Sequence, residues 1–172
     1  MGELHKIANA KIEAEQEKLL NSLPADIEAL KRKNAANGLL RSGNTILGVV
    51  ALCSNALDSL GKVVLEQYRW VVVQSLLASQ SWVEELVRAS PDQLQSLFDS
   101  CIEHVKREAN LAGAPNAAPE CIAKLEAKLG AISNDIALSL RASFAEQKRG
   151  LIRNIGNAAA DWLSKLFGGL KR

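Results

Sequence analysis

The chain has 172 residues, a net charge of only +2 and an apolar fraction of 48%. This length suits one folded unit with a real core, and so small a net charge argues against a molecule-wide attraction to nucleic acid. Aromatic residues make up 4% of the chain, and helix-forming residue types are abundant, which predicts a helical protein.

The cysteines and the start of the chain favour a cytoplasmic protein. Cys53, Cys101 and Cys121 are an odd number and lie far apart without a CxxC pair, so we expect them to be reduced. Residues 1–20 mix charged and apolar side chains, unlike a secretory signal. The longest uncharged run, residues 42–57, is shorter than the roughly 20 residues of a membrane span.

Helical periodicity recurs along the whole chain, whereas strict alternation of apolar and polar residues is sustained nowhere. We therefore expect an all-α protein, an elongated bundle of five or six helices with coiled-coil-like seams. A first helix is expected over residues 3–20. Pro24 suits the opening turn of a second helix that stops near Gly38.

The next segment carries a heptad seam, which is a stripe of apolar residues spaced 3, 4 or 7 apart. Its members are Ile46, Val50, Cys53, Leu57, Leu60, Val64 and Val71. Residues 70–77 are then apolar on most sides, which places this stretch at the centre of the bundle.

Residues 90–93, with the sequence Ser-Pro-Asp-Gln, are typical of a helix start. Ser90 is expected to cap the helix, Pro91 to take its first position, and Gln93 to complete a capping box. The helix is expected to end in a linker of Ala, Gly, Asn and Pro at residues 111–119.

A second seam follows the linker, with members Ile122, Leu125, Leu129, Ile132 and Ile136. Gly150 or Gly156 is expected to bend or break this helix before the terminal segment. We therefore expect a helical bundle over residues 1–114 and a long C-terminal helical segment over residues 115–172, which packs on the bundle or on a partner.

Residues suited to catalysis or metal binding are sparse. Cys101, His104 and Glu108 share one helical face, but a zinc site needs three or four suitable ligands, and the nearest other cysteine in the sequence, Cys121, lies across a linker. The sequence has no Glu-x-x-His pair, no phosphate-binding glycine motif and no recognisable nucleophile motif. We expect no enzyme activity, no cofactor, no metal and no small-molecule substrate.

The terminal segment, residues 151–172, combines a wide apolar face with positive charge. Its apolar residues fall on one half of a helical cylinder: Leu151, Ile152, Ile155, Ala158, Ala159, Trp162, Leu163, Leu166, Phe167 and Leu170. Residues 141–172 carry a net charge of +5, against −3 for residues 1–140. We expect the binding residues to be Ile155, Trp162, Leu163, Leu166 and Phe167 with Arg153, Lys165, Lys171 and Arg172.

Three kinds of surface could cover this apolar face: the core of the same chain, a groove on another protein, or an anionic membrane surface. The basic residues Arg141, Lys148, Arg149 and Arg153 also lie close together, as phosphate binding would require, but no stacking aromatic set accompanies them. The two seams can pair with each other or with other copies. We therefore predict a non-catalytic, self-associating helical assembly or adaptor protein; the alternative is a peripheral membrane-surface or membrane-active protein that uses residues 151–172.

Overall fold

A computed structural model describes the backbone of residues 2–75 and 78–168. Side chains are described in these ranges up to residue 150, and for Arg153. The chain order is α1 (Gly2–Ala36), α2 (Gly43–Gln74), α3 (Gln80–Ala89), α4 (Asp92–Leu111), the 3-10 turn η1 (Pro115–Ala117) and α5 (Ala118–Gly168). The all-α class is confirmed for the described residues.

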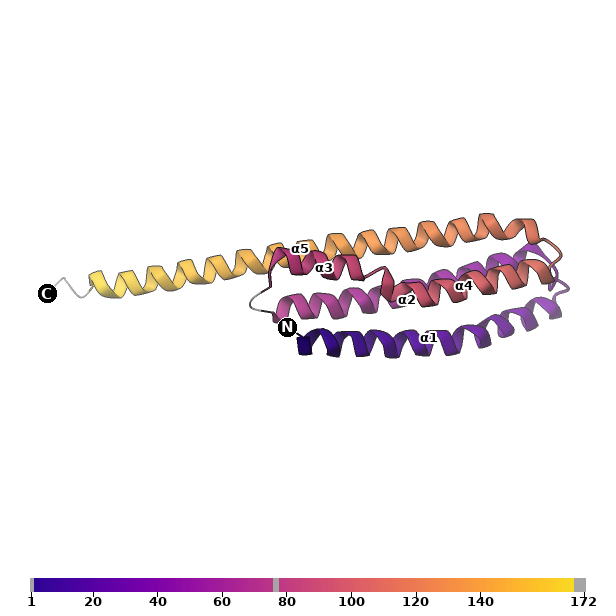
Figure 1. Ribbon diagram of the computed structural model, residues 1–172, viewed down its shortest axis with the longest axis horizontal. Helices are drawn as coiled ribbons and strands as arrows, with labels where there is room; N and C mark the ends of the chain where they lie inside the picture. Colours follow the sequence, from indigo (N-terminus) through magenta and orange to yellow (C-terminus); the bar gives the residue numbers. More distant parts are fainter. Residues whose placement is uncertain (1, 76–77, 169–172) are drawn as a thin grey trace.

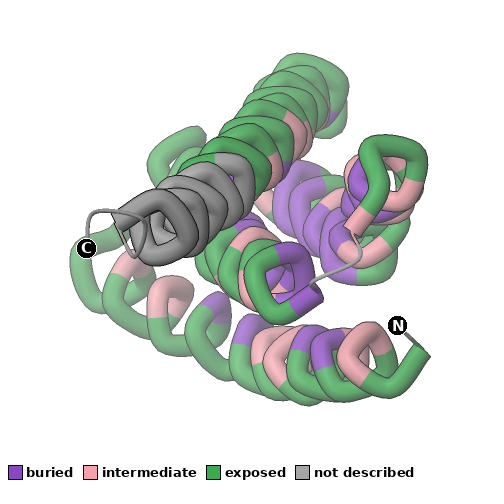
Figure 2. The backbone as a smooth tube through the Cα atoms, turned by 90° about the vertical axis from the view of Figure 1, so that its left-hand side faces the viewer, coloured by how far each residue is buried: buried purple, intermediate pink, exposed green. Residues whose placement is uncertain are grey.

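The long helices run antiparallel to their neighbours in sequence and form an elongated bundle (Figure 1). α2 lies in the middle and packs against α1, α4 and α5. The buried residues of each helix are on the side that faces the other helices, as the end view in Figure 2 shows. α2 therefore supplies the largest share of the core.

The first heptad seam is the core-facing stripe of α2, as the sequence predicts. Its seven members, from Ile46 to Val71, are all at most 8% exposed. The expectation that residues 70–77 lie at the centre of the bundle is only partly right, because Val73 is 50% exposed while Val71 and Val72 are fully buried. The helix ends one residue later, at Gln74. Leu76 and Leu77 lie outside the described residues.

The second seam packs against the first within the same chain. Leu125, Ile132 and Ile136 of α5 are buried, and α5 lies directly on α2. Gly61 of α2 allows the close approach, since a Cβ atom there would clash with Cγ2 of Ile132. Lys128 of α5 adds an ion pair with Asp58 of α2 at 2.7 Å.

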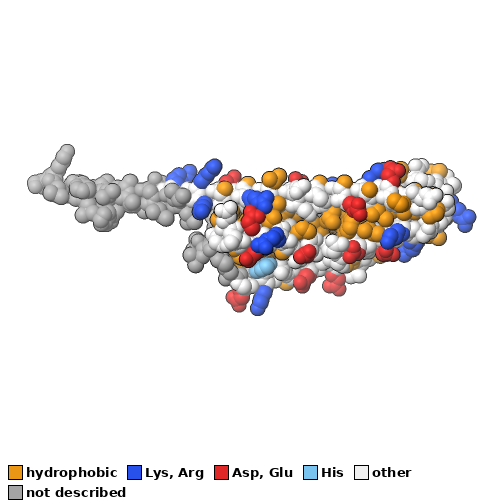
Figure 3. All heavy atoms as spheres, turned by 45° about the horizontal axis from the view of Figure 1, so that its top comes forward, with side chains coloured by type: hydrophobic (Ala, Val, Ile, Leu, Met, Phe, Trp, Pro, Cys, Tyr) orange, Lys and Arg blue, Asp and Glu red, His pale blue; other side chains and the backbone are white. Residues whose placement is uncertain are grey.

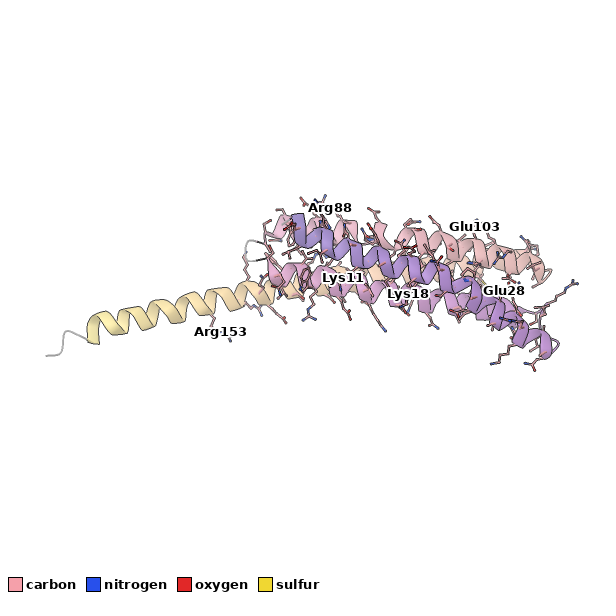
Figure 4. All side chains as sticks on the ribbon, turned by 90° about the horizontal axis from the view of Figure 1, so that it is seen from below. Lys11, Lys18, Glu28, Arg88, Glu103 and Arg153 are labelled. Carbon is pink, nitrogen blue, oxygen red and sulfur yellow. The ribbon has the colours of Figure 1, made fainter. Side chains whose placement is uncertain are left out.

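The described bundle has four long helices and one short helix, α3, so the structure does not support a count of five or six bundle helices of comparable length. The first two expected helices are one helix, α1, which runs through Pro24. Pro24 is exposed, so water can satisfy the carbonyl group that its missing N–H leaves free. α1 changes direction between Lys18 and Glu28, where proline is expected to bend a helix (Figure 4).

The expected bend or break at Gly150 or Gly156 is also wrong. α5 is helical through both glycines and ends at Gly168. A glycine within a helix costs only about 1 kcal/mol relative to alanine, which neighbouring good helix formers can offset.

The boundary at Ser90 is confirmed, but its predicted cap is not formed. α4 begins at Asp92, and the Ser90 hydroxyl donates backward to the Val87 carbonyl at 2.9 Å. Ser90 has helical backbone angles, φ −64° and ψ −36°, which direct its side chain toward the preceding turn. Only two residues, Ser90 and Pro91, therefore separate α3 from α4.

α2 is also long and apolar enough to cross a membrane by length and composition. In the described bundle its apolar face packs against α1, α4 and α5. The central helix of a helical bundle has the same composition, so this feature is weak support for a membrane span.

We expect Gly61→Ala to lower the free energy of unfolding by about 1–2 kcal/mol, because the new methyl group would displace the stiff, β-branched Ile132 and separate α2 from α5. Gly130→Ala is the matched control. A Cβ atom at Gly130 meets nothing within 4 Å, so this change should stabilise α5 by about 0.5–1 kcal/mol. Chemical denaturation measures both, and equal effects would contradict the close α2–α5 contact.

Candidate functional site on helix α5

Helix α5 carries all the predicted binding residues that the structure describes. The Arg153 side chain is exposed. Lys171 and Arg172 lie outside the described residues. The other predicted residues lie in the part of α5 whose side chains are not described: Ile155, Trp162, Leu163, Lys165, Leu166 and Phe167.

Gln147 fixes the point where α5 leaves the bundle. Its side-chain amide donates to the carbonyl groups of Val73 and Ser75, at 3.3 and 3.0 Å. These carbonyls belong to the end of α2, where helix geometry leaves acceptors without an intrahelical partner. α5 therefore caps α2 and then continues past it, as Figure 1 shows.

Arg141 ties α5 to the short helix α3. Its guanidinium makes a two-point contact with the Glu84 carboxylate, at 2.8 and 2.7 Å. The hydrogen bond and charge of Arg141 lower the pKa of Glu84. Arg141 is thus neutralised by its own chain, which corrects the grouping of this arginine with Lys148, Arg149 and Arg153 as a phosphate-binding stripe.

Lys148, Arg149 and Arg153 form a cluster of exposed positive charge at the end of the bundle; we call it the α5 basic cluster. Figure 3 shows blue side chains gathered there, and Figure 4 shows Arg153 directed away from the helix axis. Lys148 lies over the Phe144 ring, 5.6 Å from its centre. This contact holds Lys148 near the apolar side of α5.

A shallow pocket lies between α3 and the same part of α5. Its volume is about 300 Å³. Its lining combines apolar and charged side chains: Gln80, Val83, Glu84, Arg141, Phe144, Ala145 and Lys148. The pocket joins the apolar edge of Phe144 to the α5 basic cluster.

Cys101, His104 and Glu108 do not converge on one point. Cys101 faces Cys53, while His104 Nδ1 accepts a hydrogen bond from Arg107 at 2.8 Å. Glu108 is 2% exposed and lies 3.4 Å from the ammonium group of Lys31. Among the described side chains, no group of three His, Cys, Asp or Glu residues is arranged to hold a metal ion.

The described part of α5 thus combines an apolar edge with exposed cations. This arrangement can bind an acidic or amphipathic surface; the groups near it do not form a nucleophile and base pair. The hydrogen bonds of Gln147 to the end of α2 were not predicted from the sequence. The signal was present, because Gln147 is a polar residue in the apolar series Leu140, Phe144 and Leu151.

Comparisons of the chain with protein-family models, with curated proteins and with solved structures gave no match.

We expect Gln147→Leu to lower the free energy of unfolding by about 1 kcal/mol, because two α2 carbonyl groups lose their donor. Gln95→Leu is the control, since the Gln95 amide donates only to the exposed Asp99 within α4. Thermal or chemical unfolding compares the variants. Equal losses would show that Gln147 does not anchor α5.

We expect the free energy of unfolding to fall in acid because of His104. Burial and the Arg107 charge lower its pKa, although Glu108 acts in the opposite direction. The unfolded chain therefore binds more protons as the pH falls below about 6.5, and the folded state loses stability. Unfolding free energies measured from about pH 7 to pH 5 should fall less steeply for His104→Gln than for the parent chain. Identical slopes would contradict this role.

Proposed function

We propose that this protein is a non-catalytic helical assembly or adaptor protein that acts through helix-helix contacts, with residues 151–167 as the contact segment. The observation that carries the proposal is the length of α5, which continues as one helix to Gly168 beyond the end of the bundle (Figure 1). At about 1.5 Å per residue, the helix after Gly150 adds about 27 Å.

The apolar face of this segment continues the face of α5 that packs inside the bundle. Leu140 is fully buried and Phe144 packs on the core. Leu151, Ile155, Ala158 and Trp162 follow at helical spacing, which gives one stripe along α5. A stripe that packs against α3 within the bundle and then continues past it is suited to receive a further helix.

The heptad seams do not supply the external contact in this proposal. The α2 and α5 seams pack on each other inside the chain. A surface for other copies or another protein must then lie elsewhere. The contact segment is the apolar stretch that the bundle helices do not accompany among the described residues (Figure 1).

A second candidate function is binding to an anionic membrane surface, favoured by the α5 basic cluster. Lys148, Arg149 and Arg153 are exposed where the contact segment begins. Trp162 and Phe167 follow on its apolar face, which is the composition of helices that lie among lipid headgroups. Both candidate functions use the contact segment, and they differ in whether it binds a protein helix or a membrane surface.

We expect the full chain to form a defined oligomer whose mass, measured by light scattering after size separation, depends on protein concentration. Trp162→Glu combined with Leu166→Glu should shift it to a monomer, because two charges then interrupt the apolar face. Asn157→Glu combined with Ser164→Glu is the matched control, since it adds the same charge on the opposite face.

A monomer at high concentration for the unaltered chain would contradict self-association. Equal behaviour of the two double variants would contradict the assigned face. Co-sedimentation with anionic but not neutral liposomes, lost in the first double variant and kept in the second, would instead favour the membrane candidate.

A further inference from the structure

Two of the three cysteines face each other across the α2–α4 interface. The Cys53 sulfur lies 3.9 Å from the Cys101 carbonyl oxygen, and the Cys101 sulfur lies 4.0 Å from the Cys53 carbonyl oxygen. Such reciprocal contacts require the two side chains to lie beside each other between the helices. Both thiols are free and fully buried.

The third cysteine occupies a different place. Cys121 lies on the first turn of α5, beside a pocket that Gly43, Ile46 and Leu47 of α2 help to line. It is 5% exposed, and the contacts that join Cys53 to Cys101 do not include it. The chain therefore contains one thiol pair and one single thiol, which makes Cys121 an internal control.

We propose that Cys53 and Cys101 are an oxidative modification site, at which a disulfide bond joins α2 to α4. The oxidant is a small disulfide such as oxidised glutathione. One cysteine thiolate attacks it, which forms a mixed disulfide and releases one glutathione thiolate. The second cysteine thiolate then attacks the mixed disulfide, which forms the Cys53–Cys101 bond and releases the second glutathione.

The surroundings of the pair make its reaction depend on opening of the bundle. Contact with Cys53 and burial raise the pKa of the Cys101 thiol. A protonated, buried thiol is a poor nucleophile, so the closed bundle resists oxidation. When α4 separates from α2, or before the core closes during folding, the thiols meet solvent and can react.

Oxidation would stabilise the bundle against unfolding. Cys53 and Cys101 are 48 residues apart, so the bond closes a long loop that includes the break between α3 and α4. Closing a loop of this length restricts the unfolded chain and raises resistance to unfolding. The proposal is independent of the proposed function, because neither residue lies in the contact segment.

The test uses the full chain and its Cys121→Ala variant. Each is incubated with oxidised glutathione, both folded and during refolding from denaturant, and is then unfolded in iodoacetamide to label every remaining thiol. Intact mass gives the number of labelled thiols, and peptide mapping identifies the crosslink. Both proteins should lose two labelled thiols and yield a Cys53–Cys101 peptide, with faster reaction during refolding than in the folded state.

The same samples show whether the disulfide bond raises stability to denaturant. Oxidised Cys121→Ala should have a higher denaturant midpoint than its reduced form, and a thiol reductant should reverse the shift. Cys53→Ala and Cys101→Ala should form no crosslink within one chain. Full labelling of the Cys121→Ala variant after refolding with oxidant would overturn the proposal, as would a crosslink in the parent chain that uses Cys121 or joins two chains.

Discussion

The fold depends on the burial of α2 between three other helices. Its buried stripe from Ile46 to Val72 faces α1, α4 and α5, and small residues let these neighbours approach closely. Gly61 lies against Ile132 of α5, and Gly48 lies against Leu30 of α1. Because dispersion and the removal of apolar surface from water both require this close contact, the spacing around α2 sets the positions of the other helices.

That arrangement determines which surfaces remain for function. α1 and α5 lie on different sides of α2, and both heptad seams are used inside the bundle. α5 is capped onto the end of α2 by Gln147 and held to α3 by Arg141. Its direction beyond that point is therefore set by the bundle, which presents the contact segment and the α5 basic cluster at one end of the molecule.

Hydrophobic periodicity correctly predicted which helix faces are buried in the core. Local signals for helix ends and caps were less reliable, because solvent exposure and distant neighbours decide whether a helix ends or a cap forms. The α2 seam was predictable because a regular apolar stripe has to be buried. Pro24 did not end α1, since its exposed site tolerates a lost hydrogen bond. Ser90 matched a capping signature but bonds backward to Val87, and the partners of Gln147 and Arg141 lie 72 and 57 residues away, beyond any local pattern.

Hydrogen exchange along α5, measured at several protein concentrations, tests the central claim most directly. Amides of residues 121–144 should be protected equally at every concentration, because they belong to the core that α2 organises. Amides of residues 151–167 should become more protected as the concentration rises and contacts with other copies form. Protection of both regions that is equal and independent of concentration would contradict the account, because the contact segment would then belong to the bundle itself.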